Sequence, residues 1–463
     1  MPAPLHVVIL AAGKGTRMKS ALPKVLHEVG GRPLLAHVIE TARRLSANTI
    51  HVVHGHGAGA VRRWFDLAHP NDKSVQWPVK WVLQAEQKGT GHAVRQALPD
   101  IPDNAQVLVL YGDVPLVRPA TLKPLTRGAG LNLLTATLVQ PQGYGRILRD
   151  TGGEVQGIIE EKDATAAQRQ IQEINTGILS APARPLKRWL SKLKNRNAKG
   201  EYYLTDIVAM AAQDKVIVRA HGLSDADEVL GVNDREQLAQ AERLYQRRQA
   251  GVLMRQGLTL RDPEHFALRG RVEFGKDVTL DVGVVLEGEV KLGAGVFIGP
   301  YSVIKNTTLG AGTRVESHSV LDSATVGKNC RIGPYARLRP DTVLADEVHI
   351  GNFVEVKKTR IGKGSKANHL AYLGDGTVGA GVNVGAGTIF CNYDGANKHV
   401  TVIEDDVFIG SDSQLVAPVK IGQGATIGAG STITKDVPPG GLSVCRAKEQ
   451  RSYSHWKRPV KKK

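Results

Sequence analysis

Aliphatic side chains recur at every fifth or sixth position from residue 280 almost to the end of the chain. The positions are Leu280, Leu286, Leu292, Ile298, Ile304, Leu309, Val315, Leu321, Val326, Ile332, Leu338, Leu344, Ile350 and Val356, and further runs reach Ile433. A step of six fits neither the 3.6-residue turn of an α-helix nor the two-residue alternation of a strand. It is typical of a parallel β-helix, in which each face takes one hexapeptide and points its aliphatic side chain inward. Three such faces predict a coil of about 18 residues.

One polar segment interrupts this repeat, at residues 390–400, which read FCNYDGANKHV. The aliphatic spacing resumes at Ile403. Asn, Asp and Gly suit an irregular path, so we predict that this 390–400 loop leaves the regular coil. Beside a binding site, such a loop would form a wall that a smooth coil cannot supply.

The first half of the chain follows a different pattern, in which short apolar runs alternate with helical stretches. The runs read VVIL, HVV, WVL, VLVLYGD and LNLLTATLV. This alternation predicts a Rossmann-like α/β domain with a mostly parallel sheet. From Asn233 a helix is indicated, with Asn233 and Glu236 at capping-box spacing. We therefore predict an α/β domain at 1–232, a linker helix at 233–254, a β-helix at 255–440 and a basic tail at 441–463.

Composition narrows the class of protein. The chain of 463 residues has no run of about 18 apolar residues, so no membrane span is predicted. The N-terminal run HVVIL is interpreted as a buried strand and not as a secretion signal. Three cysteines, Cys330, Cys391 and Cys445, show neither metal nor disulfide spacing, and we predict a cytoplasmic protein.

The net charge of +17 is concentrated partly in the last thirteen residues, which hold six basic and no acidic side chains. Such a charge attracts any polyanion, including phosphorylated small molecules. No known nucleic-acid-binding motif accompanies it, so no nucleic-acid partner is predicted. Lys461, Lys462 and Lys463 are interpreted as a solvated end.

A glycine-rich turn follows the first strand, in the stretch AAGKGTRM. It lacks the spacing of a P-loop and the third glycine of a dinucleotide fingerprint. The turn exposes backbone N–H groups, and Lys14, Arg17 and Lys24 accompany it. Together these groups could bind a triphosphate and the negative charge that develops during its transfer.

Asp113 stands just past the strand VLVLY, where open α/β sheets place their ligand sites. A carboxylate at this position suits Mg²⁺, which takes one or two protein oxygens together with substrate phosphates. The alternative is a turn-forming Asp without a ligand.

Polar side chains that break the β-helix repeat mark a second candidate site. Arg339, Lys357, His369 and Tyr372 lie about one coil apart and can stack on one face. Arg and Lys suit a sugar phosphate, and a histidine with an ordinary pKa of about 6.5 could accept a proton from an amine that attacks a thioester. Glu355 is a candidate to orient this imidazole.

Other roles remain open for these side chains from residue type alone. His369 could be a surface residue, or it could join His318 and His349 as a zinc ligand, as in trimeric β-helix carbonic anhydrases. Cys391 could carry an acyl group, although a small buried thiol is the commoner use of cysteine.

Beyond these patterns, the chain resembles a known family over nearly its whole length. The matching motifs are LAAGKGTR followed by PK, then QAEQKGTGHA, LYGDVP, GYGRI, EINTG, EYYLTD and GVN. In order and spacing they resemble the nucleotidyltransferase half of bacterial N-acetylglucosamine-1-phosphate uridyltransferases. The second half of these enzymes is a left-handed β-helix that acetylates glucosamine-1-phosphate. The resemblance implies a bifunctional, homotrimeric, Mg²⁺-dependent enzyme that uses acetyl-CoA and UTP to make UDP-N-acetylglucosamine for peptidoglycan and lipopolysaccharide synthesis.

The resemblance also implies roles for residues of the first half. Lys24 and Arg17 would stabilise phosphates during catalysis, and Asp113 and Asn233 would bind Mg²⁺. For Asn233 the competing role is the helix cap. The residues implied to bind UTP or UDP-N-acetylglucosamine are Leu10, Ala11, Ala12, Gly13, Lys24, Gln84, Gly89, Thr90, Tyr111, Gly112, Asp113, Gly145, Glu160, Asn175, Thr205 and Asn233.

In the second half, the resemblance implies that His369 is the general base. The residues implied to bind glucosamine-1-phosphate are Arg339, Lys357, Tyr372, Asn383 and Lys398. Lys398 is implied to reach a neighbouring subunit. Those implied to bind acetyl-CoA are Ala386, Asn392, Tyr393, Ser411, Ala429 and Arg446.

Two other functions join the same pair of folds. In sugar-nucleotide pyrophosphorylases with short β-helix tails, the β-helix serves for assembly or regulation. Exchange-factor subunits of translation initiation are a non-catalytic example. The intact GTR, PK and YGD motifs favour an active first domain, and His369 with its basic neighbours favours an active second one.

Overall fold

The computed structural model describes residues 3–55, 57–68 and 78–446. The chain forms two compact units, residues 1–245 and 246–463, which divide within helix α8 (Arg235–Arg255). Of the expected basic tail at 441–463, residues 447–463 lie outside the described residues. No helix of the described ranges is long and apolar enough to cross a membrane.

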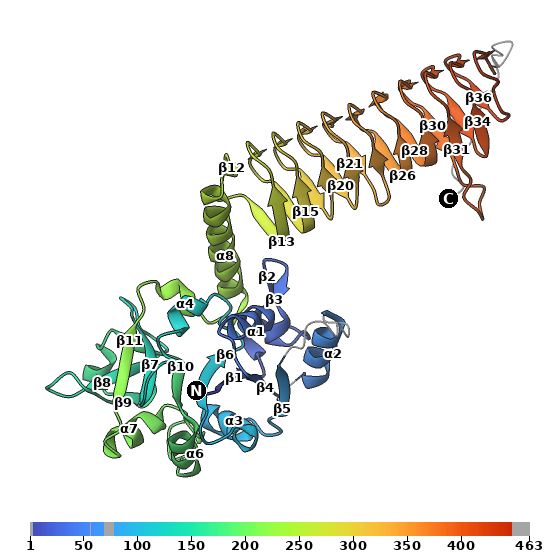
Figure 1. The fold of residues 1–463 in the computed structure, drawn as a ribbon. Helices are drawn as coiled ribbons and strands as arrows, with labels where there is room; N and C mark the ends of the chain where they lie inside the picture. The colour runs from blue at the N-terminus through green and yellow to red at the C-terminus, as the bar shows by residue number, and fades with distance from the viewer. Residues whose placement is uncertain (1–2, 56, 69–77, 447–463) are drawn as a thin grey trace, which may run out of the picture. The chain divides into compact units, whose positions relative to one another are not determined.

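The first unit is built on a largely parallel sheet, as predicted (Figure 1). Its order is β11-β7-β10-β6-β1-β4-β5, and β8 (Gly145–Arg149) and β9 (Val155–Ile159) extend it from β10. Only β10 runs antiparallel to its neighbours along this path. The strands are β1 (Leu5–Ala11), β4 (Thr49–His54), β5 (Val79–Leu83), β6 (Gln106–Tyr111), β7 (Leu131–Thr137), β10 (Glu173–Pro182) and β11 (Val218–Gly222).

Alternate side chains of the central strands enter two separate cores, because successive side chains of a strand point to opposite faces. In β1, Val7 and Ile9 join one core and Val8 joins the other. Helices α1 (Leu34–Arg44) and α2 (Ala58–Ala68) cover the first face. Helices α3 (Thr90–Ala97), α6 (Ala183–Ser191) and α7 (Asp206–Gln213) cover the second. Burial of the strands on both faces explains their continuous apolar runs.

The second unit is a parallel β-helix, which confirms the hexapeptide interpretation (Figure 1). The aliphatic positions predicted to point inward are all buried in one core. One face is the sheet of β12 (Thr259–Leu260), β14 (Thr279–Leu280), β16 (Phe297–Ile298), β19 (Arg314–Val315), β22 (Arg331–Ile332), β25 (His349–Asn352), β27 (Lys366–His369), β29 (Asn383–Val384), β32 (Phe408–Ile409), β35 (Thr426–Ile427) and β37 (Leu442–Ser443). The other faces include β26 (Glu355–Ile361), β28 (Tyr372–Val378), β30 (Ile389–Cys391) and β31 (Thr401–Ile403).

Strand pairing gives the length of each coil. Ile298 pairs with Val315 and Ile332 with Ile350, so one coil takes 17 or 18 residues. Val384 pairs with Ile409, a step of 25. The longer step contains the 390–400 loop, so the loop leaves the coil as predicted and the strands on either side remain in register.

Helix α8 begins with a cap that differs from the predicted one. The Asp234 carboxylate accepts a hydrogen bond from the Gln237 backbone N–H at 2.9 Å, and the Gln237 side-chain oxygen accepts one from the Asn233 N–H at 2.8 Å. The predicted box of Asn233 and Glu236 is therefore wrong by one residue. Since Asp234 supplies the cap, the side chain of Asn233 is available for another role.

A buried histidine pair lies near the start of the parallel strands. The Nδ1 atom of His6 and the Nε2 atom of His51 are 3.0 Å apart, and His51 is fully buried. Burial, together with the charges of His6 and Lys80, lowers the pKa of His51 to about 4 from 6.5.

We therefore expect the free energy of unfolding of the first unit to fall as the pH drops from about 6.5 towards about 4. The unfolded chain binds a proton at His51 that the folded chain excludes, and the loss from this group is at most about 3 kcal/mol. His51→Gln should flatten this pH dependence. Urea denaturation followed by tryptophan fluorescence measures it, because Trp64, Trp81 and Trp189 belong to the first unit. Equal pH slopes for the two proteins would contradict the assignment.

Candidate functional site

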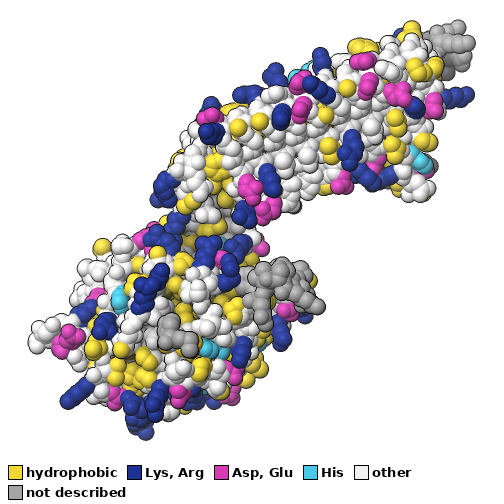
Figure 2. Space-filling view, viewed as in Figure 1, with side chains coloured by type: hydrophobic (Ala, Val, Ile, Leu, Met, Phe, Trp, Pro, Cys, Tyr) yellow, Lys and Arg dark blue, Asp and Glu magenta, His cyan; other side chains and the backbone are white. Residues whose placement is uncertain are grey.

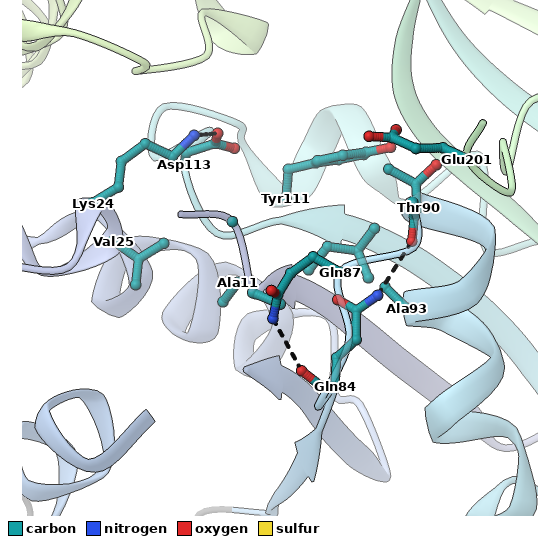
Figure 3. A pocket seen from close by; sticks show the side chains of 14 residues that line it. Ala11, Lys24, Val25, Gln84, Gln87, Thr90, Ala93, Tyr111, Asp113 and Glu201 are labelled. Carbon is teal, nitrogen blue, oxygen red and sulfur yellow. Dashed lines mark hydrogen bonds and ion pairs between the residues drawn. The ribbon is translucent and has the colours of Figure 1, made fainter. Parts of the chain in front are cut away.

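A pocket opens at the carboxyl ends of β1 and β6 (Figure 3). Its lining residues are Leu10, Ala11, Ala12, Gly13, Lys24, Val25, Gln84, Gln87, Gly89, Thr90, Ala93, Tyr111, Asp113 and Glu201. All but Val25, Gln87, Ala93 and Glu201 were expected from the sequence. Those four lie within or beside the same motifs. The motifs therefore predicted the position of the pocket, although the predicted residues did not cover its whole lining.

Lys24 lies at the polar end of this pocket and joins three distant segments. Its ammonium donates to the Asp113 carboxylate (Figure 3) and to the Asn233 side-chain oxygen, the latter at 3.2 Å. The Lys24 and Asp113 side chains are 13% and 18% exposed, so the ion pair is mostly shielded from water. The side-chain oxygens of Asp113 and Asn233 therefore both contact the positively charged Lys24 ammonium.

The glycine-rich turn passes directly beside Lys24. Gly15 has φ of +62°, and a Cβ atom there would approach the Lys24 Cβ to 2.8 Å. The turn therefore needs glycine both for its backbone angle and for this close approach. Lys14 and Arg17 are exposed on the turn. Neither belongs to the described residues that line the pocket.

Gln84 is held in a fixed orientation at the opposite side of the pocket. It is buried, its Nε2 donates to the Gly89 carbonyl at 3.3 Å, and the same atom lies 3.0 Å from the His92 Nδ1. Gly89 has φ of +103° and precedes α3, and a Cβ atom there would lie 2.7 Å from the Tyr202 carbonyl oxygen. These two contacts engage both N–H bonds of the amide, so the atom that Gln84 can offer to the edge of a base is the acceptor oxygen Oε1.

Four residues of the set expected to bind UTP or UDP-N-acetylglucosamine, namely Gly145, Glu160, Asn175 and Thr205, lie together outside this pocket lining. Asn175 pairs with Gly145 across β10 and β8, and the Thr205 hydroxyl donates to the Glu160 carboxylate at 3.1 Å. Burial, together with the charges of Glu160 and Asp113, raises the pKa of the Tyr111 hydroxyl. Gly112 follows at the end of β6, where its N–H donates to the Leu10 carbonyl at 2.9 Å.

The second candidate site lies on the β-helix around His369. The Nδ1 atom of His369 is 2.8 Å from the side-chain oxygen of Asn352, one coil earlier. An amide oxygen only accepts, so Nδ1 carries the proton and Nε2 carries the lone pair. Asn352 was missed in the sequence, although its register one coil before His369 is the signal that identifies it.

Glu355 does not orient His369, so that expectation is wrong. Its carboxylate accepts from Arg339 at 2.7 Å and lies 3.7 Å from Arg337. Glu355 thereby holds Arg339, an expected phosphate contact, at the start of β26. Tyr372 pairs with Glu355 in the strand register, and Asn383 lies one coil after Lys366.

His318 lies in a stack of exposed rings. It lies between Tyr301 and Tyr335, with ring centroids 5.4 and 5.0 Å away, and Phe353 continues the stack. His369 instead bonds to Asn352. Within one chain, the described residues contain no group of three His, Cys, Asp or Glu side chains that could hold a metal.

Four of the six residues expected to contact acetyl-CoA, namely Ala386, Ser411, Ala429 and Arg446, form a column along one corner of the β-helix. The Asp412 N–H donates to the Ala386 carbonyl at 2.6 Å, and the Gly430 N–H donates to the Ser411 carbonyl at 2.8 Å. Arg446 Nε donates to the Ala429 carbonyl at 2.5 Å and ends the column. Ala386, Ser411 and Ala429 therefore lie on successive coils.

The 390–400 loop forms a short hairpin between β30 and β31. Tyr393 and Lys398 pair in an antiparallel bridge, and the Asp394 carboxylate accepts from the N–H groups of Ala396 and Asn397. His399 also bonds to Asp394, at 2.7 Å. The loop thus has its own internal hydrogen bonds, and Asn392 at its base is buried.

Positive charge is spread over the face shown in Figure 2, with acidic side chains among the Lys and Arg residues of each unit. This distribution differs from a single basic stripe. It is the pattern expected where much of the net charge is dispersed on a solvated surface.

Comparison with known proteins identifies the same two parts. Residues 7–171 match the model of the MobA-like NTP transferase domain, residues 268–368 the GMPPB C-terminal domain, and residues 401–435 the bacterial transferase hexapeptide (six repeats).

Curated relatives match the whole chain. A bifunctional protein GlmU of Alkalilimnicola ehrlichii is 60% identical over 99% of this chain and 97% of its own length. Proteins of the same name from Stenotrophomonas maltophilia and Marinobacter nauticus are each 55% identical, over 100% and 99% of this chain and 100% of their own length. Identity of this degree over both units means that the chain belongs to the family of bifunctional GlmU proteins.

Proposed function

We propose that the chain makes UDP-N-acetylglucosamine in two steps, one in each unit. The β-helix transfers the acetyl group of acetyl-CoA to glucosamine-1-phosphate. The α/β unit then transfers a uridyl group from UTP to N-acetylglucosamine-1-phosphate and releases pyrophosphate. The observation that carries the proposal is the presence of two separate polar sites, one around Lys24 and one around His369.

In uridyl transfer, the sugar phosphate attacks the α-phosphorus of UTP and pyrophosphate leaves. The attacking oxygen is already anionic, so the chain needs no general base. Rate enhancement then comes from positioning and charge neutralisation. Lys24 supplies positive charge within the pocket, and Arg17, exposed on the neighbouring turn, is proposed to contact the triphosphate when it binds. Gln84 is proposed to select the uracil edge.

Mg²⁺ fits the oxygen pair of Asp113 and Asn233. Both oxygens contact the Lys24 ammonium, so this position favours a cation. Mg²⁺ prefers oxygen ligands and commonly takes substrate phosphates as further ligands. When bound there, it would supply positive charge to the nucleotide phosphates. Asn233 can take this role because Asp234 caps helix α8.

In acetyl transfer, the amine of glucosamine-1-phosphate attacks the thioester carbonyl, and the coenzyme A thiolate leaves. His369 is proposed to accept the amine proton at Nε2, since Nδ1 is engaged with Asn352. Arg339 and Lys357 are proposed to bind the sugar phosphate, and the column that ends at Arg446 is proposed to bind acetyl-CoA.

We propose a homotrimer in the cytoplasm as the working form. The three cysteines are free, as expected for a reducing compartment. The product would supply peptidoglycan and lipopolysaccharide precursors.

Lys24→Ala and Asp113→Ala should each remove uridyl transfer and leave acetyl transfer intact. Each change removes a charge at the convergence point of the first pocket, and the second site lies in the other unit. Pyrophosphate release and coenzyme A release, assayed separately on the same preparation, measure the two activities. Equal loss of both in a folded variant would contradict two separate sites.

His369→Ala should lower the rate of acetyl transfer by about a hundredfold or more and spare uridyl transfer. Asn352→Ala should lower it less, because the base remains but loses its orientation. Coenzyme A release as a function of pH separates the two effects. A normal acetylation rate in His369→Ala would show that another group accepts the proton.

Lys398→Ala should raise the KM for glucosamine-1-phosphate without dissociating the trimer, which sedimentation measures. If Lys398 serves a neighbouring subunit, mixing Lys398→Ala chains with His369→Ala chains should restore part of the acetyl transfer, because some mixed sites contain both residues. The structure places Lys398 beside Lys357 of its own chain. Absence of restoration would assign Lys398 to its own subunit.

A further inference from the structure

Asp375 stands out among the acidic residues of the β-helix. Within the described residues 246–446, it is the one Asp or Glu that is buried, with 7% exposure. It lies in β28 at a corner with φ of +53°. An ionised carboxylate in such a place is destabilising unless other groups compensate its charge.

Three side chains surround this carboxylate. Its Oδ2 accepts a hydrogen bond from the Asn392 Nδ2 at 2.5 Å and lies 3.4 Å from the Lys357 Nζ. Its Oδ1 lies 4.0 Å from the Lys358 Nζ. Lys357 is itself largely shielded, with an 18% exposed side chain, whereas Lys358 is 66% exposed. Lys357 is therefore the cation that mainly compensates the buried charge.

The same corner gathers more positive than negative charge. Lys357, Lys358 and Lys398 lie around one carboxylate, and the Lys357 ammonium lowers the pKa of Lys398. Like charges at close range repel, so this arrangement favours a bound anion. A phosphate monoester, which carries nearly two negative charges, matches the excess.

We propose that Asp375 is a positioning residue that joins the two substrate pockets of the acetyl-transfer site. Its contact with Lys357 orients the Lys357 ammonium toward the sugar phosphate. Its contact with Asn392 fixes the base of the 390–400 loop, which borders the acyl donor. This inference rests on the proposed acetyl transfer. It implies that one carboxylate controls the affinity for both substrates, by separate hydrogen-bonded contacts.

Asp375→Asn affects the two contacts unequally, although both are made to Oδ2. The amide oxygen in that place still accepts from Asn392, but it carries no net negative charge to attract the Lys357 ammonium. We expect the KM for glucosamine-1-phosphate to rise about tenfold to a hundredfold, with a smaller change in the KM for acetyl-CoA. Asp375→Ala loses both contacts, so both KM values should rise. Calorimetric titration with glucosamine-1-phosphate should show the same loss of affinity without turnover.

Asp341→Asn is the matched control. Asp341 has φ of +65° like Asp375, but it is exposed and no side-chain contact of the described residues involves its carboxylate. Both KM values should remain unchanged in this variant. Uridyl transfer by all three variants should equal that of the parent chain, because the first unit is untouched.

The outcomes distinguish this inference from the proposed function. If the parent chain shows no acetyl transfer, the proposed function fails. If the parent is active and Asp375→Asn keeps both KM values, the positioning role is wrong. A lower melting temperature and a lower kcat with unchanged KM values would likewise overturn it, since they would assign Asp375 a structural role only. In the supported case, the effects of Asp375→Ala and Asn392→Ala on the KM for acetyl-CoA are not additive.

Discussion

The packing of each inward aliphatic side chain on its counterpart in the previous coil sets the geometry of the whole second unit. Because Ile332 lies in register with Ile350, and Ile350 with Ala367, the outward side chains of successive coils are also aligned. Asn352 beside His369 and the column of Ala386, Ser411 and Ala429 are consequences of this register. A buried repeat that carries no chemistry therefore positions the polar groups on the coils of the proposed acetyl-transfer site, whereas Asn392, Tyr393 and Lys398 lie on the loop that leaves the coil.

In the first unit, the polar side chains of the candidate site are brought together by the parallel sheet and not by a repeat. Parallel strands end at one edge of the sheet, so segments that are distant in the chain meet there. Lys24, Asp113 and Asn233 come from three such segments and converge at one point. The ion pair is mostly shielded from water, so the charges act with less screening than on the surface. The two units thus build their proposed phosphate sites in different ways, the first from distant segments and the second from neighbouring coils.

Much of the fold could be predicted from the sequence, because its patterns were regular. The six-residue spacing had no other physical interpretation, and the apolar runs of the first half became strands, all buried on both faces except the edge strand β5. The failures concern single contacts. Asn233 and Asp234 are both good caps, and only the backbone path decides that Asp234 serves. A coil takes either 17 or 18 residues in no regular order, so spacing alone left the register uncertain, and the strand pairing is what selects Asn352 as the partner of His369. Asp375 was missed because nothing in its local sequence shows that Asn392 will fold back on it.

The longer coil around the 390–400 loop has a consequence for how such a chain can diversify. Pairing of Val384 with Ile409 shows that the extra residues leave and rejoin the coil without shifting the strands on either side. The length of that excursion is therefore uncoupled from the core. A related protein could have a longer, shorter or different hairpin here and retain the same β-helix. The outer part of this loop, which is proposed to border the acyl donor, can in this way change at little risk to folding.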